Sequence, residues 1–147
     1  MRNYTTQMNA AKLGIITPEM KAVAKKEYRT EEEIRDLVAK GQVAICANKL
    51  HTCIDPNGVG SMLRTKINVN LGVSKDCKDY DIEMKKVMAA VDMGAEAIMD
   101  LSSHGNTQPF RQKLTSECPA MIGTVPVYDS VIHYQRDLAT LTAKDFI

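Results

Sequence analysis

The sequence has no tryptophan, two phenylalanines and five tyrosines, so aromatic residues make up only 5% of it. The sequence therefore has few aromatic side chains that could recognise single-stranded RNA by stacking on its bases. Nineteen Lys and Arg residues nearly balance eighteen Asp and Glu residues, which leaves no basic stripe for nucleic acid. No apolar run approaches the roughly 20 residues of a membrane-spanning helix, and the N-terminus lacks the features of a secretory signal. We therefore expect a cytoplasmic protein that binds neither nucleic acid nor membrane.

Cysteine is also sparse, and the four residues present are far apart. Cys46, Cys53, Cys77 and Cys118 are separated by 7, 24 and 41 positions. Zinc ligands usually come in pairs two to four residues apart, and iron–sulfur ligands form similarly tight clusters. Disulfides are rare in the cytoplasm. We expect four reduced thiols and no metal ligand among them.

The N-terminal part of the sequence predicts a series of short helices. Residues 6–12 predict the first, and Thr17 followed by Pro18 marks the start of the second. The third begins with a capping box, in which the side chains of Thr30 and Glu33 each accept a hydrogen bond from the other residue's backbone N–H. We expect an N-terminal helical segment.

Farther along the chain, strand-like and helix-like patterns alternate. In chain order we expect strand, helix, strand, helix, strand and helix at residues 63–70, 79–93, 96–101, 108–117, 120–127 and 128–137. Such alternation with short connections is typical of βαβ units, which build a parallel sheet. Sheets of this kind bind ligands at the carboxyl ends of their strands.

Three residues recur at a constant interval along this part of the sequence. Asn70, Met99 and Tyr128 are spaced 29 residues apart, at or just past the end of each expected strand. A (β/α)8 barrel repeats units of about this length, since eight of them take roughly 250 residues. Doubly wound sheets have similar units, so the spacing favours a barrel and leaves that alternative open. We expect the three side chains to surround a common site.

The first of these strands has a polar face. Arg64, Lys66, Asn68 and Asn70 occupy every second position. A strand covered by helices on both faces is apolar throughout, so this face must look into something other than a helix. The interior of a barrel that binds a polar ligand would fit, with Lys66 as a point charge for phosphate. An edge strand with one solvated face is the alternative.

The number of strands is too small for a closed barrel. Three strands, or four with the apolar run at 43–47, leave an open parallel sheet with bare edges. We therefore divide the α/β chain into an N-terminal helical segment, residues 1–41, and the first βα units of an incomplete (β/α)8 barrel, residues 42–147. We interpret the sequence as the front part of a longer protein; completion of the sheet by another chain is the alternative.

Four segments, in order and spread over nearly the whole chain, resemble the phosphomethylpyrimidine synthase family. Each is six or seven residues long, and four such motifs in the family's order are a specific signal. The segments are Gly14-Ile15-Ile16-Thr17-Pro18-Glu19-Met20, Lys66-Ile67-Asn68-Val69-Asn70-Leu71-Gly72, Ala97-Ile98-Met99-Asp100-Leu101-Ser102 and Gly123-Thr124-Val125-Pro126-Val127-Tyr128.

This resemblance implies a (β/α)8-barrel lyase of thiamine biosynthesis. Family members convert 5-aminoimidazole ribotide to hydroxymethylpyrimidine phosphate, using S-adenosylmethionine and a 4Fe–4S cluster to generate a 5′-deoxyadenosyl radical. Motif matching assigns substrate binding to Asn70, Met99 and Tyr128. The family's C-terminal cysteine triplet and its metal-binding histidines, which imply a zinc site, have no match in this sequence. The resemblance therefore places the cluster and zinc ligands outside this chain, and we expect the chain alone to be inactive.

Two alternatives to thiamine synthesis remain open. The related 5-hydroxybenzimidazole synthases start from the same ribotide and make a cobamide lower ligand, so residues that bind the ribotide cannot separate the two products. A non-catalytic module that binds a ribotide or assembles with a partner chain is the alternative from another class. In each case bare sheet edges favour association, as a homodimer or with a further chain segment.

Overall fold

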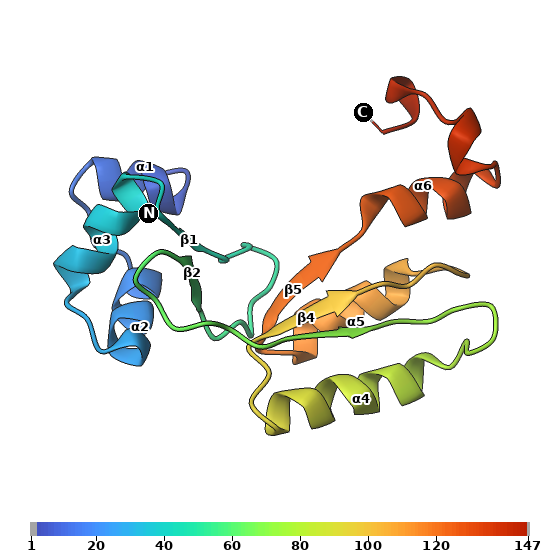
Figure 1. Ribbon diagram of the computed structural model, residues 1–147, viewed down its shortest axis with the longest axis horizontal. Coiled ribbons are helices and arrows are strands. Elements are labelled where there is room, and N and C mark those ends of the chain that lie inside the picture. Colours follow the sequence, from blue (N-terminus) through green and yellow to red (C-terminus); the bar gives the residue numbers. More distant parts are fainter. Residues whose placement is uncertain (1–2, 147) are drawn as a thin grey trace. The chain divides into compact units, whose positions relative to one another are not determined.

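The computed structural model describes residues 3–146 and divides the chain into two compact units, Met1–Lys66 and Ile67–Ile147. Among the described residues, the first unit contains three helices and a pair of short strands, and the second contains a parallel sheet with its helices (Figure 1). The expected boundary after residue 41, which marks the start of a barrel, stays a prediction.

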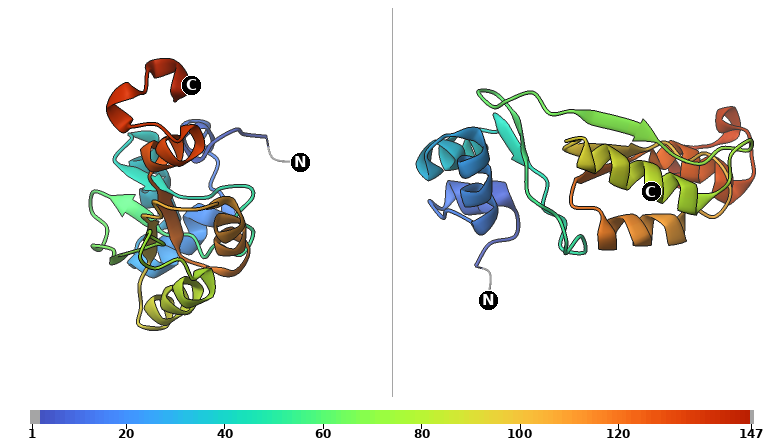
Figure 2. Two further views of the ribbon diagram at one scale, coloured as in Figure 1. Left: turned by 90° about the vertical axis from the view of Figure 1, so that its right-hand side faces the viewer. Right: turned by 90° about the horizontal axis from the view of Figure 1, so that it is seen from below.

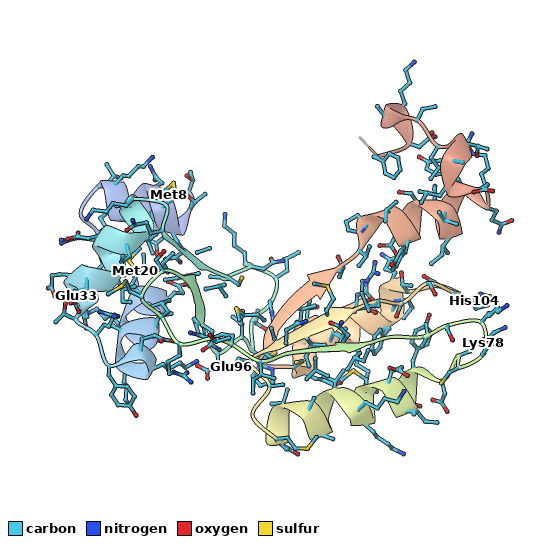
Figure 3. The ribbon with its side chains drawn as sticks, in the orientation of Figure 1. Met8, Met20, Glu33, Lys78, Glu96 and His104 are labelled. Atoms are coloured by element: carbon cyan, nitrogen blue, oxygen red, sulfur yellow. The ribbon has the colours of Figure 1, made fainter. Side chains whose placement is uncertain are left out.

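In the first unit, short helices pack around a small apolar core. These are α1 (Gln7–Lys12), α2 (Pro18–Glu27) and α3 (Glu31–Ala39). Thr17 caps α2 and Thr30 caps α3 with the complete capping box, as predicted. Met20 of α2 is fully buried on the side of this helix that faces α3 (Figure 3), and it packs in a cluster that also contains Val23, Ile34 and Val38.

Two short strands complete the first unit. β1 (Val43–Ile45) pairs with β2 (Gly58–Gly60), and the pairing is antiparallel. The apolar run at 43–47 is therefore not a fourth strand of the parallel sheet, because it pairs within the helical unit.

The first half of the strand expected at 63–70 has a different role. Lys66 Nζ forms an ion pair with Glu27 at the end of α2, and the two side chains are only 5% and 1% exposed. Glu27 also accepts a hydrogen bond from the backbone N–H of Arg64 at 2.8 Å. The prediction that Lys66 provides a point charge for phosphate is therefore wrong, because Glu27 neutralises it. The sequence pattern could not reveal a partner 39 residues away.

This buried ion pair predicts a pH-dependent stability. Burial opposes the charge of Glu27, but the hydrogen bonds from Lys66 and Arg64 outweigh it and hold the pKa of Glu27 below its usual 4.5. Between the lowered pKa and the usual one, the folded state therefore binds fewer protons than the unfolded chain. The contribution to stability is therefore complete above the usual pKa and is lost as the pH falls through the lowered one.

We expect Glu27→Gln to reduce the free energy of unfolding by about 2 kcal/mol near neutral pH, because it leaves the Lys66 ammonium buried without a counter-ion. The difference from the wild type should shrink on acidification, since protonated Glu27 resembles glutamine. Urea unfolding at a series of pH values measures both effects. A difference that stays constant from about pH 7 to about pH 3 would contradict this account.

The second unit contains a parallel sheet. β3 (Asn68–Leu71), β4 (Ala97–Asp100) and β5 (Met121–Thr124) lie in the order β3-β4-β5. The crossover helices are α4 (Tyr80–Asp92), between β3 and β4, and α5 (Gln108–Glu117), between β4 and β5. Both strand pairs are parallel, which confirms the predicted βαβ organisation.

Both crossover helices cover the same face of the sheet. Ile98, at the centre of β4, is fully buried against Val87 of α4 and Phe110 and Leu114 of α5 in one apolar cluster. A strand side chain points to one face only, so α4 and α5 must lie on that face. Figure 2 shows the two helices running beside the strands. The opposite face of the sheet is therefore not covered by α4 or α5.

The last helix begins earlier than expected. α6 (Pro126–Tyr134) starts directly after β5, because Pro126 suits the first helical position. Two single turns follow, η1 (Leu138–Thr140) and η2 (Ala143–Asp145). Within residues 3–146, no helix has both the length and the apolar character needed to cross a membrane. Tyr128 consequently lies in the first turn of α6.

Candidate functional site at the carboxyl edge of the sheet

The face of the sheet opposite α4 and α5 carries two of the three expected site residues. Side chains alternate along a strand, so Asn68 and Asn70 point away from the face that Val69 presents to the helices. Asn70 lies directly opposite Met99, and Met99 lies opposite Gly123 of β5. The polar face predicted for Asn68 and Asn70 is therefore confirmed, with both side chains exposed.

Contacts along this row restrict the orientation of the side chains. Asn68 Nδ2 donates a hydrogen bond to Asn70 Oδ1 at 2.9 Å, which leaves the Asn70 amide group free to donate. The side chain of Met99 extends over Gly123. A Cβ at residue 123 would lie 2.8 Å from Met99 Cε and 2.9 Å from Met99 Sδ. Glycine at this position thus gives the thioether room to lie flat on the sheet.

Tyr128 occupies a different kind of position from Asn70 and Met99. It lies four residues beyond the end of β5, within α6, and it is 39% exposed. The structure therefore brings Asn70 and Met99 together as neighbours on adjacent strands and places Tyr128 beyond the carboxyl end of the third strand. The loops after β3 and β4, marked by Lys78 and His104, lie at this same end of the unit, whereas Glu96 lies at the other (Figure 3).

The loop after β3 is held by hydrogen bonds to α4 and to the loop after β4. The Glu83 carboxylate is completely buried and accepts a hydrogen bond from Gly72 N at 3.0 Å. Ser102, also buried, accepts one from Val73 N at 3.1 Å through its hydroxyl oxygen. The hydrogen bond and charge of Glu83 raise the pKa of Lys86, although its partial desolvation opposes this. These contacts fix the edge of the sheet beside Asn70.

A second network joins β4 to α5 and α6. Asp100 is fully buried and accepts hydrogen bonds from Ser102 N at 2.9 Å and from Arg111 Nε at 2.8 Å. Arg111 Nη1 forms an ion pair with Asp129 of α6, and Thr107 Oγ1 donates to the other Asp129 oxygen at 3.0 Å. One guanidinium group therefore bridges two carboxylates from different elements.

Electrostatics follow from this arrangement. Partial burial opposes the charge of Arg111, but hydrogen bonds and charge from Asp129 and Asp100 outweigh it and raise the pKa of Arg111. Burial and the negative charge of Asp100 raise the pKa of Tyr80. Tyr80 stacks on Phe110 and donates to the backbone oxygen of Asn106 at 2.8 Å. Both groups consequently keep their ordinary protonation states at neutral pH.

This network was not predicted from the sequence, although two signals were available. Asp100 is a carboxylate within a short apolar strand, where a buried charge needs a partner. Arg111 lies near the start of α5, the end of the helix that follows the carboxyl end of β4, where Asp100 also lies. Nothing in the sequence indicates that Asp129, 18 residues further on, completes the bridge.

The donor set of the described residues does not fit a metal or an iron–sulfur cluster. Within residues 3–146, no three side chains of His, Cys, Asp or Glu lie close enough together to hold a metal ion. The cysteines are dispersed: Cys46 and Cys77 are exposed, and Cys118 is buried in the core between the helices and the sheet. The described residues therefore provide a ligand set for neither group.

Comparison with known proteins relates these positions to a family. Residues 6–147 match the radical SAM ThiC family. A phosphomethylpyrimidine synthase from Clostridium botulinum (type A, strain Hall) is 57% identical over 145 residues, which cover 99% of this chain and 33% of the relative. Another, from Alkaliphilus oremlandii, is 58% identical over 144 residues, which cover 98% of this chain and 33% of the relative.

The chain thus spans about a third of the length of these relatives. The matched range, residues 6–147, spans both strand pairs of the parallel sheet and the first turn of α6. With a family match over nearly all of its residues, this chain belongs to the radical SAM ThiC family.

Proposed function

We propose that this chain contributes part of the substrate site of a phosphomethylpyrimidine synthase, which converts 5-aminoimidazole ribotide to hydroxymethylpyrimidine phosphate in thiamine biosynthesis. The observation that carries the proposal is the row formed by Asn70 and Met99 on the face of the parallel sheet that α4 and α5 leave uncovered. The phosphomethylpyrimidine synthases that match nearly the whole chain support the choice of reaction.

A (β/α)8 barrel is the complete fold that the family match favours. In such a barrel all crossover helices lie outside, and the strands follow one another in sequence around the axis. The order β3-β4-β5 with α4 and α5 on one face fits a segment of a barrel. It fits one βαβαβ half of a doubly wound sheet equally well, so the choice of a barrel rests on the family. In such a barrel, Asn70 and Met99 would face the interior.

The three site residues offer complementary contacts to a ribotide. Asn70 can donate to a ribose hydroxyl or to the edge of the aminoimidazole ring. Met99 provides a polarisable surface for a flat heterocycle, and its half-buried side chain lies over Gly123. Tyr128 supplies a phenolic hydroxyl from beyond the carboxyl end of β5. These roles position the substrate and include no acid, base or radical step.

Radical chemistry in this proposal depends on groups bound elsewhere in the enzyme. S-adenosylmethionine and a 4Fe–4S cluster would supply the 5′-deoxyadenosyl radical, and a zinc ion would occupy a separate site. The ligands of the cluster and of zinc would lie in other parts of the enzyme, because no three His, Cys, Asp or Glu side chains within residues 3–146 lie close enough together to hold a metal ion.

The substrate site can be tested by replacing Asn70 in the complete enzyme. We expect Asn70→Ala to weaken binding of 5-aminoimidazole ribotide by about 1–3 kcal/mol, because the polar groups of the ribotide that Asn70 contacts lose their hydrogen-bond partner. Isothermal titration calorimetry measures the effect. Lys85→Ala, on the exposed surface of α4, is the control and should bind the ribotide as the wild type does. Unchanged affinity in Asn70→Ala would remove this residue from the site.

Product analysis separates the proposed reaction from its alternatives. Under anaerobic conditions with reconstituted cluster and S-adenosylmethionine, we expect the complete enzyme to form hydroxymethylpyrimidine phosphate from the ribotide. Formation of 5-hydroxybenzimidazole instead would assign the enzyme to cobamide synthesis. Ribotide binding without turnover, from protein with a full complement of cluster, would favour a non-catalytic module.

A further inference from the structure

The helix that carries Tyr128 lacks an apolar anchor. None of the described residues of α6 is buried. Helices in proteins are usually held by packing an apolar face against the rest of the fold. α6 must therefore be oriented by other contacts if Tyr128 is to occupy a defined place beyond β5.

The polar contacts of Asp129 meet this requirement. Asp129 directly follows Tyr128 in the first turn of α6. Its two carboxylate oxygens are bound by two different residues, Thr107 at the N-terminal cap of α5 and Arg111 within α5. One accepts from Thr107 Oγ1 at 3.0 Å, and the other pairs with Arg111 Nη1. Because both oxygens are bound, the carboxylate cannot rotate without losing a hydrogen bond.

Arg111 is itself anchored to the strand that carries Met99. Its Nε donates to Asp100, which is fully buried and directly follows Met99 in β4. The planar guanidinium presents its N–H groups in a rigid fork, so binding by Nε also fixes where Nη1 points. A continuous polar chain thus connects the backbone beside Met99 to the backbone beside Tyr128.

We propose that Arg111 and Asp129 form a positioning pair for substrate binding, holding Tyr128 at a set place relative to Met99. They act through Tyr128 and do not touch the ribotide. This inference rests on the proposed function, because it requires that Tyr128 binds the ribotide. We infer in addition that the contribution of the Tyr128 hydroxyl to binding depends on the ion pair between Arg111 and Asp129.

A double-mutant cycle in the complete enzyme tests this dependence. Tyr128→Phe removes the hydroxyl, and Asp129→Asn weakens the ion pair while keeping the shape of the side chain. Asp129→Asn is preferred to a change at Arg111, because loss of Arg111 would leave the buried Asp100 without its counter-ion. Asp81→Asn is the matched control: it removes a carboxylate from the first turn of α4, where Asp81 pairs with an exposed lysine of α5.

The affinity for 5-aminoimidazole ribotide is measured by calorimetry in each background. We expect Tyr128→Phe to weaken binding about ten-fold in the wild type and in Asp81→Asn, but less than three-fold in Asp129→Asn. A pair that only stabilised the fold would lower the melting temperature and leave the effect of Tyr128→Phe at its full size. Arg111→Lys is the second variant, because it keeps the charge but not the fork, and it should reduce the Tyr128→Phe effect in the same way.

The outcomes distinguish the inference from the function on which it rests. If Tyr128→Phe weakens binding equally in the Asp129→Asn, Arg111→Lys and Asp81→Asn backgrounds, the inference is overturned and the substrate site stands. If Tyr128→Phe binds the ribotide as well as the wild type does, Tyr128 has no role in binding, so the inference is overturned while the site formed by Asn70 and Met99 stands. If the wild type does not bind the ribotide, both the inference and the proposed function fail.

Discussion

Gly72→Ala is expected to lower the free energy of unfolding of this chain by about 3 kcal/mol or more. Gly72 has a φ of +140°, a region that side chains strongly disfavour, and it lies where the loop after β3 meets the loop after β4. A Cβ here would lie 2.5 Å from the backbone nitrogen of Ser102 and 2.8 Å from the carbonyl carbon of Leu101. Both neighbours are backbone atoms of a tightly held loop, so the strain cannot be relieved by rotating a side chain.

Gly94→Ala separates the steric contribution from the backbone contribution. Gly94 also has a positive φ, of +95°, but a Cβ there would meet no atom within 4 Å. We expect its substitution to cost about 1 kcal/mol, from backbone strain alone. Urea unfolding followed by circular dichroism measures both variants. Equal losses of stability would show that the contact with the loop after β4 is not the cause.

The second large effect is expected at Arg111. Arg111→Met should destabilise the chain by about 3 kcal/mol, because it leaves the Asp100 carboxylate buried without its cation. Asp100 is 0% exposed and keeps only its hydrogen bond from Ser102 N. The substitution also removes one of the two groups that bind the Asp129 carboxylate and leaves only the hydrogen bond from Thr107, so α6 should become more accessible to proteases.

Lys113→Met on the same helix provides the comparison. Lys113 pairs with Asp81 at 3.2 Å, but the two side chains are 42% and 83% exposed, so water already solvates both charges. Exposed ion pairs of this kind contribute about 0–1 kcal/mol. Unfolding curves and limited proteolysis give the two measurements. If Arg111→Met and Lys113→Met have the same stability, the burial of Asp100 does not make the Arg111 ion pair important.

Local sequence patterns predicted most of the secondary structure of this chain. Threonine caps, the apolar periodicity of α4 and α5, and the alternation of strands with helices act over a few residues, so they can be recognised without coordinates. The parallel direction of the sheet followed from that alternation and is confirmed. Errors arose at boundaries, as in the strand that begins at Asn68 and the helix that begins at Pro126.

The candidate site was predicted in part. The spacing of 29 residues correctly indicated that Asn70 and Met99 are neighbours on parallel strands, because equal βα units bring equivalent positions into register. The same spacing treated Tyr128 as equivalent, whereas it lies in the first turn of α6. A regular interval cannot show where a strand stops and a helix starts when a proline begins the helix early.

The chain order of the residues was enough to establish the class of fold, the direction of the strands and the polar character of one sheet face, because these depend on periodicity and short-range capping. Ion pairs between distant residues could be found only in the folded molecule. Lys66 alternates with Asn68 and Asn70 in the sequence, yet it is buried against Glu27. Arg111 gains its role from Asp100 and Asp129, which lie 11 residues before it and 18 after it. A buried charge is stabilised by the partner that the fold brings within hydrogen-bonding distance, and the distance along the chain carries no information about which partner that is.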